Sequence, residues 1–218
     1  MKIFTDFEQY SDDWWRERRG RPSASEFSSI ITPAKAQLSK GADAYIFRLL
    51  GDLYDVEYPR KDSIATAAMR RGTAMEAESR AYYELHTGVD VQQVGGCLDD
   101  SGRFWCSPDF LIGNDGVGEL KNPMPDVQLE RVYAGVLPDD CKVQCHGHIV
   151  VTGRAYCHFL SYCPGCPPLL IRVEPDTFTD KLRAALESFW IRFLEIKTKI
   201  EELNSEKRLG LEPPKGTT

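Results

Sequence analysis

Two acidic residues and a lysine form the stretch of the sequence that is best suited to chemistry. Asp109 begins a strand-like run, a Gly-Asn-Asp-Gly turn reverses the chain, and Glu119 and Lys121 end the next run. Alternate residues of a strand share a face, so Glu119 and Lys121 are predicted to point to one side. The hairpin can bring Asp109 next to Glu119. Adjacent carboxylates repel each other unless a divalent cation lies between them, and oxygen ligands suit Mg²⁺ or Mn²⁺ better than zinc.

The lysine beside such a cation indicates hydrolysis of a phosphodiester. A metal-bound water must be polarised and positioned before it attacks phosphorus, and an ammonium near the cation, with a lowered pKa, can serve there. The backbone carbonyl of Leu120 adds another oxygen ligand if its strand lies at an edge of the sheet. The alternative is a surface hairpin with solvated acids and a solvated lysine, and the spacing alone favours neither interpretation.

The elements that must position these residues follow from hydrophobic periodicity and from turn residues. A meander of short strands is expected over 91–121, and two further strands over 155–162 and 169–173. Ser23 and Glu26 have the spacing of a capping box at the start of a short helix. The other helices are expected over 6–18, 42–56, 63–86, 139–151 and 178–203. This order predicts a mixed α/β fold, a central mixed β-sheet flanked by helices.

Composition sets limits on the class of protein. The chain has 218 residues, of which 42% are hydrophobic and 28% charged, which is typical of one globular domain over 1–208. The Gly- and Pro-rich segment 209–218 is expected to be a flexible tail. The N-terminus is acidic and no apolar run reaches the length of a membrane helix, so an intracellular location is expected. The net charge of −6 argues against coating of nucleic acid by bulk attraction, but it permits a local basic groove.

Seven cysteines are an odd number, scattered over 97–166, and we expect reduced thiols rather than a disulfide framework. Cys163 and Cys166, with Cys157 nearby, also suit an iron–sulfur cluster, but the first cysteine of the chain, Cys97, lies on a strand-like run. Pro167 and Pro168 follow where a redox motif would need a helix, so a turn between two strands is the favoured interpretation.

Several segments resemble a known family. Pro108-Asp109 with Glu119-Leu-Lys121 resembles the active-site motif of the PD-(D/E)XK nuclease superfamily, which has a restriction-endonuclease-like core. Three further segments are similar to motifs of the phage lambda exonuclease family, the YqaJ-type viral recombinases. They are the stretch 14–25, then Gly72-Thr-Ala-Met-Glu76 with Arg80 and Glu84, and finally Gln144 with Gly147 and Val151-Thr-Gly153. The four motifs follow the family's order and cover about 14–162.

The resemblance implies a role for each catalytic position. Asp109, Glu119 and the Leu120 carbonyl would bind two Mg²⁺ ions, for which Mn²⁺ could substitute, and Lys121 would act on the attacking water. Glu76 would help to hold the second ion, and its alternative role is an ordinary acid on a helix surface. Gln144 would bind near the attacked phosphate, and its alternative role is a solvated amide.

The resemblance also places a terminal 5′-phosphate at Arg18 and Ser25. A helix N-terminus offers free N–H donors, and an arginine adds a charged, bidentate fork. The alternative is that Arg18 belongs to a solvated basic patch with Arg16, Arg19 and Arg21, and that Ser25 only lies in the capping turn.

The implied function is metal-dependent degradation of one strand of duplex DNA from its 5′ end. This leaves a 3′ single-stranded overhang for recombination beside a single-strand annealing protein. A homotrimeric ring and a phage or prophage origin, in the bacterial cytoplasm, are implied as well. Two alternatives stay open: a PD-(D/E)XK endonuclease with another DNA substrate, and a DNA-binding subunit with an inactive site.

The last motif departs from the family's pattern. A tyrosine and further glutamines are common where this sequence has Cys141, His146 and His148. The histidines can take over a polar role in the site. A zinc site formed with Cys141 and Cys145 is a weaker alternative, because His146 and His148 do not share a face of the expected helix.

Overall fold

The computed structural model describes residues 1–58 and 67–208, and the side chains of 67–73 and 206–208 lie outside this description. Its centre is a five-stranded mixed sheet with the strand order β2-β5-β6-β7-β8. These strands are β2 (Val91–Gln92), β5 (Phe110–Ile112), β6 (Gly116–Lys121), β7 (Tyr156–Ser161) and β8 (Leu169–Val173). The helices are α1 (Asp12–Arg18), the 3-10 helix η1 (Ala24–Ser29), α2 (Ala42–Tyr54), α3 (Ala67–Thr87), α4 (Pro125–Ala134), α5 (Asp139–Thr152) and α6 (Thr177–Arg208). The expected mixed α/β fold is therefore confirmed.

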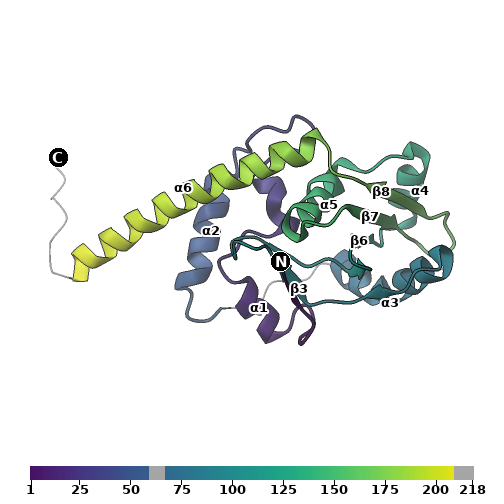
Figure 1. Ribbon diagram of the computed structural model, residues 1–218, viewed down its shortest axis with the longest axis horizontal. Helices are drawn as coiled ribbons and strands as arrows, with labels where there is room; N and C mark the ends of the chain where they lie inside the picture. Colours follow the sequence, from purple (N-terminus) through teal and green to yellow (C-terminus); the bar gives the residue numbers. More distant parts are fainter. Residues whose placement is uncertain (59–66, 209–218) are drawn as a thin grey trace.

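Helices cover both faces of the sheet (Figure 1). On one face Val117 and Phe159 belong to the main core together with Ile149 of α5 and Leu182 of α6. On the other face Leu120, Leu160 and Phe110 pack around Tyr83 of α3. Because side chains alternate along β6, residues 117, 119 and 121 turn toward the face that α5 covers.

Two glycines in β6 allow rings to lie against the strand. A Cβ at Gly116 would lie 2.4 Å from the ring of Tyr156, and a Cβ at Gly118 would lie 2.0 Å from the ring of Phe110. Real Cβ atoms do not approach other atoms this closely, so only glycine fits while the rings stay in place. Phe110 directly follows Asp109, so Gly118 and Phe110 together set how close β5 and β6 approach beside the two acids.

A second, small sheet explains why the expectation of one meander was wrong. The strands β3 (Gly96–Leu98) and β4 (Trp105–Cys106) form a separate sheet in the order β1-β3-β4, in which β3 pairs with both β4 and β1 (Lys2–Phe4). The sequence did not predict β1. Phe4, Trp14 and Trp105 form a separate aromatic core there. The N-terminal strand thereby fixes α1 next to the end of β4.

Two N-terminal helices differ from expectation. Residues 6–11 are not helical, and α1 begins at Asp12 behind Ser11, whose side chain accepts a hydrogen bond from the Trp14 N–H. Tyr10 has φ 67°, a left-handed conformation that ends any helix on that side. The expected capping box at Ser23 is also wrong, because Ser23 caps no N–H and η1 is a six-residue 3-10 helix.

The later helices agree better with the sequence. The helices α2 and α5 lie within two residues of their expected bounds, and β8 matches its expected range. The helix α3 ends before Gly88 as expected, while the expected start at Ser63 lies outside the described residues. The helix α4 was not predicted. The long helix α6 runs along the molecule and extends past the other elements, beside α2 (Figure 1). The expected tail 209–218 lies outside the described residues.

Candidate active site

Strand β6 and helix α5 hold the centre of the candidate site. Lys121 Nζ donates a hydrogen bond to Gln144 Oε1 at 3.1 Å, and His148 Nε2 lies 2.7 Å from Glu119 Oε2. Gln144 and His148 are one turn apart on α5, a rise of about 6 Å, and Glu119 and Lys121 are about 6.6 Å apart on β6. Because the two spacings match, Gln144 contacts Lys121 and His148 contacts Glu119 at the same time.

The hairpin adds Asp109. The strand pairing ends with Phe110 opposite Gly118, and the Asp109 N–H donates a hydrogen bond to the Gly118 carbonyl at 3.0 Å, directly beside Glu119 in the chain. The Leu120 N–H donates to Asp109 Oδ2, 2.5 Å away. β6 is the central strand of its sheet, so the condition of an edge strand is not met. The strand β5 nevertheless ends at Phe110. The Leu120 N–H points toward Asp109, and the carbonyl of the same strand residue points to that side of β6 as well.

The two carboxyl groups differ strongly in pKa. Burial and the neighbouring charge of Glu119 raise the pKa of Asp109 well above its usual range. Burial acts in the same direction on Glu119, but the Lys121 charge and the hydrogen bond from His148 outweigh it and lower its pKa to about 2. Glu119 is therefore the permanent anion of the site, and Asp109 is held next to it against electrostatic repulsion.

Lys121 is held by Glu119 in the absence of a cation. Its Nζ lies 2.5 Å from Glu119 Oε1. Burial opposes the charged form, yet the charge of Glu119 and this hydrogen bond prevail and raise the lysine pKa. The lowered pKa expected from the sequence is thus not found, because the paired charge of Glu119 raises the pKa of Lys121 instead. A cation at the carboxylates would compete with Lys121 for Glu119.

The donor set fits a hard divalent cation. Asp109 and Glu119 offer carboxylate oxygens side by side, their mutual repulsion is relieved only in part, and the Leu120 carbonyl faces the same space. The charge of Glu76 on α3 acts on Asp109, so this acid lies near the site. Among the described residues, however, no three His, Cys, Asp or Glu side chains converge closely enough to hold an ion by themselves. Glu76 is near the site without being clustered with the other two acids.

The repulsion predicts a stabilising substitution. Asp109→Asn removes an ionisable group whose charged form is disfavoured by burial and by the charge of Glu119, and it keeps an oxygen that can accept the Leu120 N–H. We expect the metal-free variant to unfold at a higher temperature than the wild type, by about 2–4 °C for each ~1 kcal/mol gained in a chain of this size. Thermal unfolding in EDTA measures this. Mg²⁺ should then stabilise the wild type more than the variant, and a lower melting temperature of the variant in EDTA would contradict the electrostatic interpretation.

Arg18 and Ser25 lie together, as the resemblance implies. The Arg18 guanidinium donates to Ser25 Oγ at 3.5 Å and lies over the ring of Trp14, 4.9 Å from its centroid. The helix η1, which carries Ser25, packs on α5 at Gly147, where a Cβ would come within 2.9 Å of both Ala24 and Phe27. This packing ties the pair to the helix that carries Gln144.

The neighbouring arginines have other partners, which argues against a general basic patch. Arg19 donates to the carbonyls of Asp52, Leu53 and Asp55 at the end of α2. Arg16 pairs with Asp13, and Arg21 pairs with Glu17. Because η1 is a short 3-10 helix, its N-terminus contributes less to anion binding than expected, and a phosphate there would depend mainly on Arg18.

Tyr10 lies near both the acidic residues of the site and Arg18, and the sequence did not identify it as a site residue. Burial and the charges of Glu76 and Asp109 raise the pKa of Tyr10, while the charges of Arg18 and Lys121 oppose this rise. The ring packs on Trp14 with centroids 5.1 Å apart, and this contact covers part of a residue that is otherwise 57% exposed. The positive φ of Tyr10 takes the residue out of the helix in which hydrophobic periodicity places it, and this is what brings the ring to the site.

The two histidines point in different directions, which removes the alternative of a zinc site. His146 Nδ1 lies 2.9 Å from Thr179 Oγ1 at the start of α6, whereas His148 contacts Glu119. All seven cysteines are free thiols. Six of them lie as neighbours in pairs, Cys97 with Cys106, Cys145 with Cys157, and Cys163 with Cys166, and Cys141 is the seventh.

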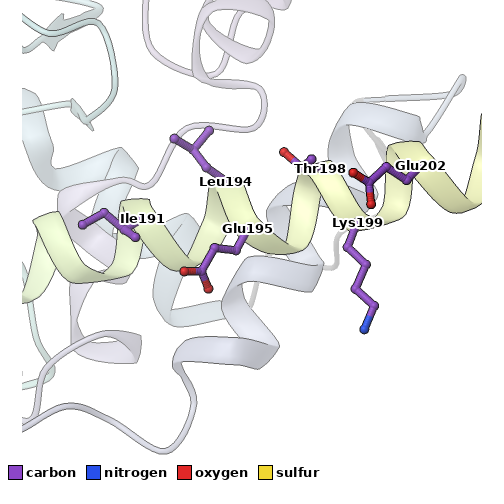
Figure 2. Close-up of a pocket in the computed structure, with 6 residues that line it drawn as sticks. All are labelled: Ile191, Leu194, Glu195, Thr198, Lys199 and Glu202. Atoms are coloured by element: carbon purple, nitrogen blue, oxygen red, sulfur yellow. The ribbon is translucent and has the colours of Figure 1, made fainter.

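A surface hollow of about 640 Å³ lies away from these residues, on α6 (Figure 2). Its lining, as described, comes from α6 alone, and the labelled side chains project from several sides of that helix (Figure 2). No helix in the described part of the chain is long and apolar enough to cross a membrane.

Two solved proteins that share this fold are described as exonucleases. An alkaline exonuclease from Laribacter hongkongensis, LHK-Exo, is 26% identical over 88% of this chain and 100% of its own, with a TM-score of 0.70. A structure of LHK-Exo in complex with dAMP matches with the same values. A phage-related exonuclease from Haemophilus somnus is 11% identical over 83% of this chain and 96% of its own, with a TM-score of 0.56, which shows a shared fold.

No curated protein sequence matches this chain. The profile of the YqaJ-like viral recombinase domain matches residues 13–155, a range that contains Arg18, Ser25, the Asp109–Lys121 hairpin and the contact face of α5. The match covers well over half of the 218 residues and agrees with the motif order in the sequence. The chain belongs to the YqaJ-like viral recombinase domain family.

Proposed function

We propose that this protein is a Mg²⁺-dependent exonuclease that degrades one strand of duplex DNA from its 5′ end and leaves a 3′ single-stranded overhang. The observation that carries the proposal is the group formed by Asp109, Glu119, Lys121 and Gln144 on β6, α5 and the hairpin. Support comes from LHK-Exo, an alkaline exonuclease whose structure with dAMP suggests a DNA substrate. The overhang would serve phage-type recombination beside a single-strand annealing protein.

Each residue of the site would have a separate role in hydrolysis of the phosphodiester. A bound divalent cation would supply the charge that activates a water and neutralises the attacked phosphate. Asp109, Glu119 and the Leu120 carbonyl would hold it, with Glu76 toward a second ion. Lys121, freed from Glu119, would orient the water and stabilise charge on the phosphate, while Gln144 Oε1 accepts a hydrogen bond from the lysine ammonium and would hold it in place. Arg18 and Ser25 would hold the terminal 5′-phosphate and set which bond lies at the site.

An end-labelled linear duplex separates this function from its alternatives. With Mg²⁺ and a 5′-phosphorylated end, a 5′ label should be released early while a 3′ label on the same strand stays in long fragments. A covalently closed circle should remain intact, and EDTA should stop the reaction. Cutting of the circle would identify an endonuclease, and DNA binding without cleavage in Mg²⁺ or Mn²⁺ would identify an inactive subunit.

Assembly is proposed to be a homotrimeric ring around the duplex. A ring holds DNA by enclosure, which suits a chain of net charge −6 whose outer surface does not attract phosphate strongly. We expect sedimentation at micromolar concentration to give the mass of three chains. Only monomer under these conditions would contradict the ring.

A further inference from the structure

We propose that His148 positions Glu119 for binding of the divalent cation, as the residue that fixes the rotation of this carboxylate. The inference rests on the proposed function. His148 itself touches neither the cation nor DNA and acts through Glu119, so its role is positioning.

The contact is buried and directional. Glu119 is 3% exposed and His148 is 1% exposed, and their Oε2 and Nε2 atoms lie 2.7 Å apart. The carboxylate oxygen can only accept, so His148 Nε2 must carry the proton and donate it. Among the described residues, His148 Nδ1 has no hydrogen-bond partner, which agrees with a bare nitrogen there and the proton on Nε2.

Glu119 needs such a partner because its terminal torsion is soft. The torsion that turns a glutamate carboxylate has a broad, roughly two-fold preference rather than sharp minima. Lys121 holds Oε1, but this side chain is 34% exposed, has a flexible stem, and is also the proposed catalytic group. The imidazole of His148 is rigid and buried in α5, so it can hold Oε2 while Oε1 and the remaining lone pairs face the cation.

His146 provides a matched control on the same helix. It is also a buried histidine of α5, and its ring bonds to Thr179 and packs on Phe178 instead of contacting the site. Replacement of either histidine removes a buried hydrogen bond of α5. Only replacement of His148 removes a hydrogen bond to Glu119.

The experiment measures Mn²⁺ binding to the metal-free, full-length protein by electron paramagnetic resonance. His148→Leu should weaken Mn²⁺ binding by about 10- to 100-fold, as loss of an outer hydrogen-bond partner of a ligand does. His148→Gln, whose amide can reach Glu119, should keep near-normal affinity, and so should His146→Leu. His148→Asn, with an amide too short to reach, should resemble His148→Leu and serves if the leucine variant does not fold.

The outcomes separate two failures. Unchanged Mn²⁺ affinity in folded His148→Leu or His148→Asn, with a wild type that binds Mn²⁺ and cleaves DNA, would overturn the positioning role alone. Equal weakening by His148→Gln would overturn it too, because the donated hydrogen bond would then not be the cause. A wild type that neither binds Mn²⁺ nor cleaves DNA would overturn the proposed function together with this inference.

Discussion

Lys121→Ala is expected to slow DNA cleavage by at least about a hundredfold, the effect of losing a group that acts on the attacking water. The side chain also neutralises Glu119, with 2.5 Å between Nζ and Oε1, so the variant removes one of the two ion-pair partners that Glu119 has among the described residues and keeps the other, His148. Affinity for duplex DNA should change little, because this single ammonium is bound inside the site rather than spread along a groove.

Cleavage is measured as initial rate on a 5′-phosphorylated duplex with saturating Mg²⁺, and affinity by fluorescence anisotropy in EDTA. Lys142→Ala is the matched control, since Lys142 lies on α5 two residues before Gln144, and its Nζ lies over the ring of Phe178, 4.6 Å from the ring centroid. It removes one positive charge and should leave the rate nearly unchanged. Cleavage by Lys121→Ala at close to the wild-type rate would exclude the assigned role.

Arg18→Ala is expected to slow digestion of a 5′-phosphorylated end by roughly tenfold to a hundredfold, while a slow 5′-hydroxyl end is nearly unaffected. A charge-assisted contact to phosphate contributes about 1.5–3 kcal/mol. Among the described residues, the pair formed by Arg18 and Ser25 suits a phosphate contact. Arg19 and Arg21 suit it less, because they already bind backbone carbonyls or an acidic side chain.

The design is a comparison of three proteins on two ends at one fixed ionic strength, because salt weakens every phosphate contact. The third protein is Arg16→Ala, a solvent-facing arginine of α1 that pairs with Asp13 and should behave as wild type on both ends. Equal losses on the two kinds of end in Arg18→Ala would make Arg18 a general backbone contact and remove the basis for 5′ polarity.

The parts of the fold that could be predicted are those with regular local patterns. The hairpin between Asp109 and Glu119 follows from a turn between two strand-like runs, and it already places the acids beside Lys121. The helix expected over 139–151 ends one residue later, at Thr152, and the role expected of Gln144 on it came from the family resemblance. The helix α4 could not be predicted, because its pattern is inverted: Gln128 is fully buried while Tyr133 is 95% exposed. Gln128 reaches the carbonyls of Ser161 and Pro167, which are distant in sequence.

The remaining site residues depend on contacts that no local pattern encodes. The strand β1 is three residues long and pairs with Gly96–Leu98, more than ninety residues away. Tyr10 leaves the expected helix through a left-handed backbone, and His148 meets Glu119 only because a helix and a strand have matching rises along their contact. The sequence predicts that His148 lies on a helix, but only the three-dimensional structure shows that its partner is Glu119.

The close packing of Gly118 on the Phe110 ring has a consequence for mutational screens. In a library scored by activity alone, substitutions at Gly118 are expected to rank with those at Asp109 and Glu119, although glycine has no functional group. Any side chain there must push the ring, and with it the start of β5, away from β6. Such a screen therefore has to score abundance of folded protein as well, because only that second readout separates a residue that performs chemistry from one that leaves room for it.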